Sequence, residues 1–217
     1  MSNFKAVIFD FNGTLFLDND KHVLAWGKMS KLIRHKDLTI EELHEHCNGI
    51  PNKQVVNWMF NGECDEATME KYSYLKEEYY RDFCKADTEN FHLIAGAEQY
   101  FDKLKAEAIP FTIASASIKP NIDFFVDNFH LDKWIDYDKI IYDDGSYENK
   151  VAMFKKAAEV LNVETSDCLI IEDSISGIRS GYEAGCRNII VLDSAHAAKR
   201  YKDLAGVNKI INDFNEM

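Results

Sequence analysis

The sequence predicts an α/β protein: a Rossmann-like, three-layer core around a parallel sheet, with an inserted α-helical cap domain. Three observations lead to this fold class. Short, continuously apolar runs recur along the chain, and helical periodicity fills the segments between them. Roughly 75 residues of helical pattern separate the first two runs, far more than one crossover connection needs.

The apolar runs are the predicted strands. Their hydrophobicity is continuous rather than alternating, which is typical of parallel strands buried on both faces. Helices predicted over residues 97–106 and 150–161 fit right-handed crossovers between neighbouring strands. The predicted strands are residues 4–9, 111–116, 139–142, 168–171 and 188–192, with a weaker one at 209–211.

The long helical segment after the first strand predicts a second domain. Apolar residues recur at helical spacing over residues 21–34 and again over 66–83, which favours amphipathic helices packed on each other. We therefore assign residues 1–16 and 93–217 to the α/β core domain and residues 17–92 to the helical cap domain.

The composition is that of an acidic, foldable chain. It has 217 residues, 46% of them hydrophobic, and 25 Lys and Arg against 37 Asp and Glu give a net charge of −12. This charge repels a phosphate backbone, so we expect no nucleic-acid partner. A small phosphorylated metabolite can still bind through local amides, hydroxyls, a lysine and a metal. We expect a monomer.

Cysteine usage and the short apolar start favour the cytoplasm. The five cysteines lie far apart without C-x-x-C spacing, which is typical of reduced core residues rather than of disulfides or zinc ligands. The apolar run at residues 4–9 is too short for a signal peptide or a membrane span. We therefore predict a cytoplasmic protein that does not enter a membrane.

Polar residues stand where the predicted strands end. D-F-N-G-T follows the first strand at residues 10–14, S-A-S comes after the second at 115–117, and E-D-S follows the fourth at 172–174. The carboxyl ends of parallel strands share one edge of the sheet, so we expect these groups to meet there. Two acidic centres on neighbouring strand ends can hold Mg²⁺ through oxygen ligands, which makes Asp10 a candidate nucleophile toward phosphorus.

The remaining polar groups fit the same chemistry. Ser115 can hold a phosphoryl oxygen, and Lys150, placed before a predicted helix, can supply charge to a negative transition state. Each piece alone also has an ordinary structural interpretation, as a turn former, a helix cap or a solvated lysine. Their joint presence in this order favours the catalytic interpretation.

Taken together, the motifs resemble those of the haloacid dehalogenase superfamily, in its β-phosphoglucomutase-like group with a helical cap. The resemblance spans nearly the whole chain and rests on FDFNGT at 9–14, ASAS at 114–117, Lys150 and IEDSISGI at 171–178. It implies an aspartyl-phosphate on Asp10 and Mg²⁺ as the cofactor. The implied metal site comprises Asp10, Asp173 with Glu172 beside it, and the main-chain carbonyl of Asn12.

The resemblance also implies the residues that bind the substrate. Ser115 and Lys150 would hold the transferring phosphoryl group, with Ala116 and Ser117 beside them. Lys119, just after Ser117, is a further candidate contact. Mutase-like relatives carry an Arg near Asn52, and its absence here argues against tight binding of a bisphosphate.

Asn12 departs from the pattern of the family. Most relatives have an Asp at this position, which protonates the leaving oxygen and later activates water. Asn has no titratable proton, and general acid–base help is worth about 10² to 10⁴ in rate. The substitution weakens the case for a fast mutase or phosphatase unless the leaving group is good or another residue carries the proton.

Four cap residues are candidate substrate contacts. His22 either replaces the missing acid or is structural, and Trp26 either packs in the core or touches the ligand. Asn52 and Lys53 belong to a loop, residues 48–53, that we expect to face the core domain, although a solvated Lys at a helix start is an equal alternative.

The sequence therefore predicts a Mg²⁺-dependent phosphatase acting on a small phosphate monoester, such as a sugar phosphate, through Asp10. One alternative is a sugar-phosphate mutase, in which the phosphoryl group passes to a sugar hydroxyl. A second is a low-turnover protein that binds a phosphorylated ligand, which Asn12 would explain.

Overall fold

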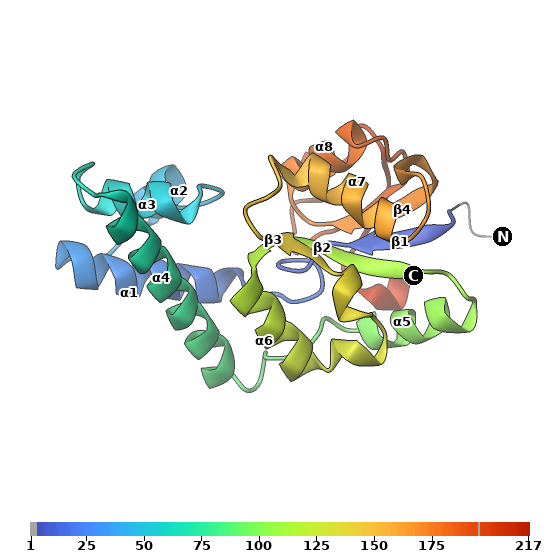
Figure 1. Ribbon diagram of the computed structural model, residues 1–217, viewed down its shortest axis with the longest axis horizontal. Coiled ribbons are helices and arrows are strands. Elements are labelled where there is room, and N and C mark those ends of the chain that lie inside the picture. The colour runs from blue at the N-terminus through green and yellow to red at the C-terminus, as the bar shows by residue number, and fades with distance from the viewer. Residues whose placement is uncertain (1–3, 195) are drawn as a thin grey trace. The chain divides into compact units, whose positions relative to one another are not determined.

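The computed structural model describes residues 4–194 and 196–217 and contains a six-stranded sheet (Figure 1). Every strand pairing in it is parallel, and the spatial order is β3-β2-β1-β4-β5-β6. The strands are β1 (Ala6–Phe9), β2 (Phe111–Ile118), β3 (Ile141–Asp143), β4 (Cys168–Glu172), β5 (Ile189–Leu192) and β6 (Val207–Ile211). The predicted α/β class and parallel sheet are confirmed.

The direction in which the sheet grows reverses at β1. The chain adds β2 and then β3 on one side of β1, and afterwards adds β4, β5 and β6 on the other side. Such a switch point leaves room beyond the carboxyl ends of the central strands, where ligands bind in open α/β sheets. The ends of β1, β2 and β4 all lie at this switch point.

Helices cover both faces of the sheet, as Figure 1 shows. On one face α7 (Lys150–Val160) and α8 (Ile175–Glu183) pack against alternate strand residues such as Ala6 and Ile8. On the other face lie α5 (Ala97–Ala106) and α6 (Lys119–Phe129). Because successive strand residues point to opposite faces, β1 must be apolar at every position, and all four of its residues are fully buried.

Aromatic rings fill the layer under α5 and α6. Phe9 meets Phe101 edge to face at a centroid distance of 5.2 Å, and Phe11 stacks on Phe125 at 4.1 Å. Rings in these arrangements stabilise a core beyond the area they bury. The two rings flank Asp10 in the sequence, so the backbone that carries this residue is anchored on both sides.

The segment between β1 and β2 is helical, as predicted. It contains α1 (Asn19–Arg34), α2 (Ile40–His46), α3 (Asn52–Met59) and α4 (Glu66–Ala86). Helices predicted over 21–34 and 66–83 correspond to α1 and α4, which extend two residues earlier and three residues later respectively. A separate apolar cluster that includes Trp26, Met29, Val55 and Met59 forms the core of this segment.

Contacts divide the chain into two compact units. One comprises Asp18–Phe91, and the other comprises the residues up to Leu17 together with His92–Met217. That these units are separate domains with the limits 1–16, 17–92 and 93–217 stays a prediction.

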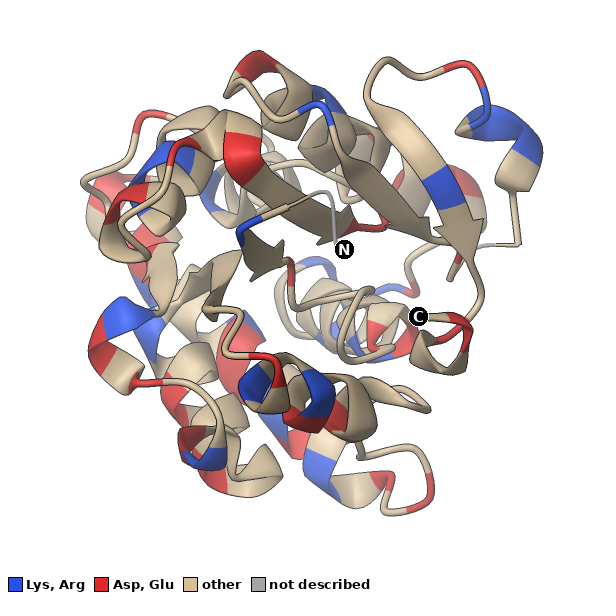
Figure 2. Ribbon diagram, turned by 90° about the vertical axis from the view of Figure 1, so that its right-hand side faces the viewer, with Lys and Arg blue, Asp and Glu red and all other residues tan. Residues whose placement is uncertain are grey.

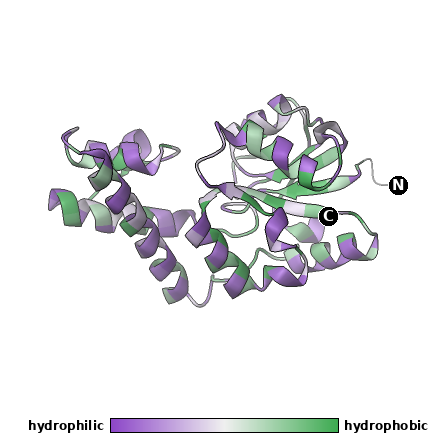
Figure 3. Ribbon diagram, viewed as in Figure 1, coloured by the Kyte–Doolittle hydropathy of each residue, from purple (hydrophilic) through white to green (hydrophobic). Residues whose placement is uncertain are grey.

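Surface and interior differ clearly in character. Figure 3 shows hydrophobic residues in the central strands and alternating with hydrophilic ones along the helices, while Figure 2 shows basic and acidic residues interspersed along the helices. In the two described stretches, no helix is both long enough and apolar enough to cross a bilayer.

Candidate active site

The first loop of the site holds Asp10 directly beyond β1. The backbone N–H of Asp10 donates to the carbonyl of Ile171 at 2.9 Å, which extends the pairing of β1 with β4 by one residue. Three N–H groups, those of Thr14, Leu15 and Phe16, then donate to the carbonyl of Phe11 and close a tight loop. The loop needs glycine at position 13, because φ is +79° there and a β-carbon would lie 2.4 Å from Oδ2 of Asp173.

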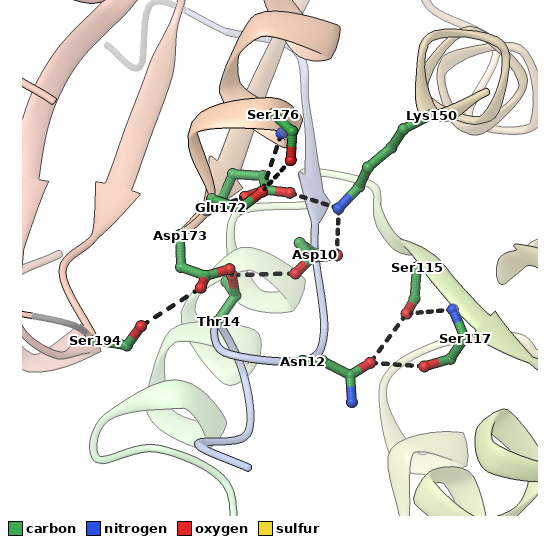
Figure 4. A network of polar contacts seen from close by, with 12 residues as sticks. Asp10, Asn12, Thr14, Ser115, Ser117, Lys150, Glu172, Asp173, Ser176 and Ser194 are labelled. Carbon is green, nitrogen blue, oxygen red and sulfur yellow. Dashed lines mark hydrogen bonds and ion pairs between the residues drawn. The ribbon is translucent and has the colours of Figure 1, made fainter. Parts of the chain in front are cut away.

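Lys150 enters the site from the first turn of α7. The side chain of Asn149 caps this helix by accepting a hydrogen bond from the N–H of Ala152 at 3.1 Å. The ammonium of Lys150 lies 2.6 Å from Oδ1 of Asp10 and also donates to Oε1 of Glu172 (Figure 4). Lys150 thus joins the carboxylates at the ends of β1 and β4.

Glu172 and Asp173 play different structural parts. Glu172 is fully buried, and its second oxygen accepts a hydrogen bond from the N–H of Ser174 at 2.5 Å, so both of its carboxylate oxygens have partners. Asp173 is oriented by weaker bonds, from Thr14 Oγ1 at 3.2 Å and from Ser194 Oγ at 3.4 Å (Figure 4). Glu172 therefore fixes Lys150, while Asp173 presents its oxygens beside those of Asp10.

Asn12 faces β2. Its Oδ1 accepts hydrogen bonds from Ser117 Oγ at 2.7 Å and from Ser115 Oγ at 3.3 Å (Figure 4). The backbone N–H of Ser117 donates to Ser115 Oγ at 3.2 Å. Strand β2 continues to Ile118 with an irregular register after Ser115, so the S-A-S segment lies within the strand rather than after it.

Burial and the close spacing of the charges shift the pKa values of three groups in the site. Burial raises the pKa of Asp10 to about 7; Lys150 opposes this shift and the charge of Glu172 adds to it. Burial raises the pKa of Asp173 to about 8, reinforced by Glu172 and Asp10. Burial works to lower the pKa of Lys150, but its two carboxylate partners outweigh that effect and the net shift is upward.

The acidic cluster fits a divalent cation. Asp10, Glu172 and Asp173 each offer a carboxylate oxygen, and these oxygens lie within 4.8 Å of one another. Among the described residues the three carboxylates lie near the ammonium of Lys150, and burial, with repulsion between the carboxylates, raises the pKa values of Asp10 and Asp173. Hard oxygen ligands of this kind suit Mg²⁺.

A comparison with known proteins identifies the family. A model described as a haloacid dehalogenase-like hydrolase matches residues 4–185, which is most of the chain. The chain belongs to the haloacid dehalogenase-like hydrolases. The resemblance predicted from the sequence is thereby confirmed.

Individual relatives of this hydrolase agree with the assignment. A HAD hydrolase of family IA, variant 3, from Entamoeba histolytica is 38% identical, with a TM-score of 0.91 over 98% of this chain and 95% of that one. A β-phosphoglucomutase from Clostridium difficile shares the fold, with 22% identity and a TM-score of 0.74 over 99% of this chain and 93% of that one.

A curated relative matches over part of its length. The bifunctional riboflavin kinase/FMN phosphatase of Arabidopsis thaliana is 30% identical over 124 residues, 56% of this chain. The hydrolase described here matches about a third, 32%, of the length of that relative.

Three of the four cap residues predicted to bind substrate lie around Lys76 and Glu77 within their own unit. His22 Nδ1 lies 2.8 Å from the ammonium of Lys76, and Asn52 Nδ2 donates to Glu77 Oε1 at 2.7 Å. Lys76 also donates to Glu77 Oε1 at 2.8 Å. Trp26 is buried in the cap core, with the Lys76 ammonium 5.2 Å from its ring centroid.

The two other predicted lysine contacts are paired on the surface. Lys53 bonds Glu66 Oε1 at 2.5 Å, and the ammonium of Lys119 lies 2.9 and 2.8 Å from the two carboxylate oxygens of Asp123. Ala116 is exposed between the two serines. The substrate-binding roles of these residues stay predictions.

Sequence reasoning did not single out four residues of these networks. Thr14 was within a quoted motif, and its position one residue after Gly13 was the available signal. Ser194 stands two residues beyond a predicted strand, where strand-end chemistry is expected. Lys76 continues the predicted inner face of α4, four residues after Tyr72, and its neighbour Glu77 supplies the opposite charge.

Proposed function

We propose that the protein is a Mg²⁺-dependent phosphatase that hydrolyses a small phosphorylated metabolite through a covalent phosphate on Asp10. The observation that carries the proposal is the meeting of Asp10, Lys150 and Asp173 at the carboxyl ends of β1 and β4, at the switch point of the sheet. Family membership supports the hydrolytic outcome.

The reaction proceeds in two displacements at phosphorus. A carboxylate oxygen of Asp10 attacks, the bond from phosphorus to the leaving oxygen breaks, and an aspartyl-phosphate forms. Water then attacks the same phosphorus and releases inorganic phosphate and the Asp10 carboxylate. Lys150 and Ser115 hold the non-bridging oxygens, whose negative charge needs compensation in both steps.

The metal would be held by Asp10, Asp173 and the main-chain carbonyl of Asn12. Glu172 has both oxygens engaged by Lys150 and Ser174, so its contribution is to position Lys150 and to add negative charge nearby. When bound, Mg²⁺ supplies charge that offsets the repulsion between a phosphate and the carboxylates.

The cap is proposed to select the substrate. His22, Trp26, Asn52 and Lys53, together with Lys119 and the Ala116–Ser117 segment of the core, are the proposed contacts. Within the cap the Lys76–Glu77 pair links three of these residues, since Lys76 touches His22 and Trp26 while Glu77 holds Asn52. A substitution in the pair should therefore change KM for the substrate more than it changes the chemistry on Asp10.

Phosphate release from a panel of metabolite phosphates, measured with Mg²⁺ and with EDTA, tests the proposal. We expect metal-dependent turnover that is lost in Asp10→Asn, whose amide cannot attack phosphorus. Turnover that survives in Asp10→Asn, or that is equal in EDTA, would refute the mechanism.

Asn12 favours one competing function, a protein that binds a phosphorylated ligand with little turnover. Undetectable phosphate release combined with micromolar binding of a panel member would support this alternative. The β-phosphoglucomutase fold keeps a mutase as a further alternative. Isomerisation of β-glucose 1-phosphate without phosphate release would favour the mutase.

A further inference from the structure

The supply of protons at the site restricts the leaving groups that it can accept. When phosphorus leaves an alcohol oxygen, that oxygen carries away an electron pair and needs a proton in the transition state. A positioned acid contributes about 10² to 10⁴ to such a step. The question for each described side chain near Asp10 is therefore whether it can donate a proton to the leaving oxygen.

Each of the four charged groups of the core site already has another role. Lys150 is held as a cation by two carboxylates. Glu172 accepts hydrogen bonds on both oxygens, from Lys150 and from the N–H of Ser174, so both of its oxygens are already engaged. Asp10 is the nucleophile and Asp173 a proposed metal ligand. None of the four is placed as a proton donor to a leaving oxygen.

Asn12 reaches the phosphate-binding serines but cannot supply a proton. Because Oδ1 accepts from Ser117 and Ser115, the carbonyl end of its amide points to β2 and the NH₂ end points away from these hydroxyls. An amide NH₂ can donate a hydrogen bond to a leaving oxygen, yet it does not release its proton near neutral pH. Asn12 can therefore orient a leaving group without protonating it.

His22 is held by its own unit. The Lys76 ammonium lies 2.8 Å from Nδ1, and Nε2 lies 3.5 Å from Asp18 Oδ2. The imidazole also stacks on Tyr80 with a centroid distance of 4.1 Å. Both nitrogens and one face of the ring are thus engaged inside the cap.

From this arrangement, and resting on the proposed function, we infer the class of substrate. The structure assigns to this enzyme phosphoryl compounds whose leaving group departs as a stable anion, namely aryl or enol phosphates and acyl phosphates, in preference to phosphates of sugar or polyol hydroxyls. Asn12, which lies two residues after Asp10, contacts Ser115 and Ser117 and holds no transferable proton, is the residue that determines this specificity.

The chemical balance of the first step needs no acid. Asp10 forms a bond to phosphorus, the phosphorus–oxygen bond breaks, and the leaving group takes the electron pair as a phenolate, enolate or carboxylate. In the second step water adds to phosphorus, and its proton is lost to the released phosphate or to solvent. Because none of the described acidic and basic groups considered above is placed to take that proton, the aspartyl-phosphate is expected to accumulate during turnover.

A leaving-group series on the holoenzyme tests the inference. The probes are acetyl phosphate, p-nitrophenyl phosphate, phenyl phosphate and glycerol 3-phosphate, each with Mg²⁺, in the wild type and in Asn12→Asp. The wild type should favour the first two probes over glycerol 3-phosphate by at least about 10², the value of the missing acid. Asn12→Asp should raise kcat/KM for glycerol 3-phosphate by about 10² and leave acetyl phosphate within a few-fold.

Asn12→Ala is the matched control, because it also lacks a proton but loses the hydrogen bonds to the two serines. It should keep the steep preference for good leaving groups, and loss of the preference in this variant would contradict the inference. Intact-mass analysis must show that residue 12 of the wild-type sample is still Asn, because an Asn followed by Gly can deamidate to an acid. The same analysis during acetyl phosphate turnover should detect a phosphorylated wild type and no phosphorylated Asp10→Asn.

The outcomes separate the inference from the proposed function. Equal rates for glycerol 3-phosphate and p-nitrophenyl phosphate in the wild type, with all turnover lost in Asp10→Asn, would refute the substrate class and leave the phosphatase proposal standing. Turnover that does not need Asp10 would refute both.

Discussion

A β-carbon on residue 177 would stand 1.7 Å from Oε1 of Glu172, so the helix start of α8 and the buried carboxylate at the end of β4 fit together only because residue 177 is glycine. The N–H of Gly177 also donates to the Ser174 hydroxyl at 3.0 Å, which caps the helix. The same close approach that fixes Glu172 therefore also fixes its bond to Lys150.

Gly177→Ala should disrupt the site without touching any proposed ligand directly. The new methyl group forces Glu172 to move, Lys150 loses one of its two partners, and the position of the ammonium beside Asp10 is no longer fixed. We expect kcat to fall by about 10² or more, because displacing a catalytic group by an ångström costs that much. Steady-state kinetics of phosphate release measure the effect.

Gly27→Ala is the matched control for this substitution. Gly27 lies within α1, and nothing stands within 4 Å of a β-carbon added there. Alanine at this position should raise the free energy of unfolding by about 0.5 to 1 kcal/mol and leave kcat unchanged. Equal losses of kcat in both variants would show that the loss does not come from the contact between residue 177 and Glu172.

Lys150→Met should cost both activity and stability. The substitution leaves the carboxylates of Asp10 and Glu172 buried without their shared cation, and breaking a buried ion pair from one side costs about 3 to 5 kcal/mol. Thermal unfolding in EDTA should show a lower Tm, and Mg²⁺ should restore part of the difference by replacing the lost charge. Phosphate release should become undetectable.

Lys156→Met, on the same helix, removes a lysine that pairs with Glu159 on the surface. Its Tm and kcat should equal those of the wild type. If Lys150→Met unfolds at the wild-type temperature in EDTA, the ammonium of Lys150 does not stabilise the buried carboxylates.

Metal-free stability should fall as pH rises. Asp10 and Asp173 have folded-state pKa values of about 7 and about 8, against an ordinary value of 3.8. Between these limits the folded protein holds protons that the unfolded chain has lost, so the free energy of unfolding decreases with pH across this window. Mg²⁺ binds the deprotonated carboxylates, and the increase in Tm that it causes should therefore grow with pH.

Thermal unfolding at pH 5, 6, 7 and 8, with EDTA or with saturating Mg²⁺, measures both trends. Asp173→Asn removes one of the two groups, so its Tm in EDTA should depend less on pH and its response to Mg²⁺ should be smaller. A wild-type Tm in EDTA that rises from pH 5 to pH 8, unchanged in Asp173→Asn, would contradict the origin we assign to these shifts.

Much of the fold was predictable because the local signals agree with one another. Continuous apolar runs gave every strand, and the helix predicted over 97–106 has those limits in the structure. The end of β2 was not predictable, because a register irregularity carries the strand past Ser115 to Ile118, and no residue pattern specifies it.

The candidate site was predictable only at the level of residue types and strand ends. The strand-end motifs predict that Asp10 and Glu172 lie at one edge of the sheet, but no sequence feature predicts that Lys150 bonds both of them. The difference in role between Glu172, which positions Lys150, and Asp173, which presents its oxygens beside Asp10, cannot be inferred from two adjacent acids in a sequence. It depends on the close approach of Gly177 and on the N–H of Ser174, which are tertiary details.

Within the cap, the buried pair Lys76–Glu77 should behave as one unit. Their side chains are 3% and 7% exposed and bond at 2.8 Å, and Lys76 also holds His22. Lys76→Met alone should destabilise the protein by about 3 kcal/mol, because Glu77 keeps its charge in the interior. The double variant Lys76→Met/Glu77→Gln should lose less than the sum of the two single variants, by about 1 to 3 kcal/mol of coupling.

Urea unfolding of the four proteins in this cycle measures the coupling, and Lys31→Met serves as the control, since Lys31 pairs with Asp37 on an exposed part of the cap. Lys31→Met should match the wild type. Additive losses in the cycle would show that the two charges do not depend on each other. If the pair also positions His22 and Asn52 for substrate, the double variant should raise KM while Asp10 is still phosphorylated by acetyl phosphate, a result that loss of folding alone cannot produce.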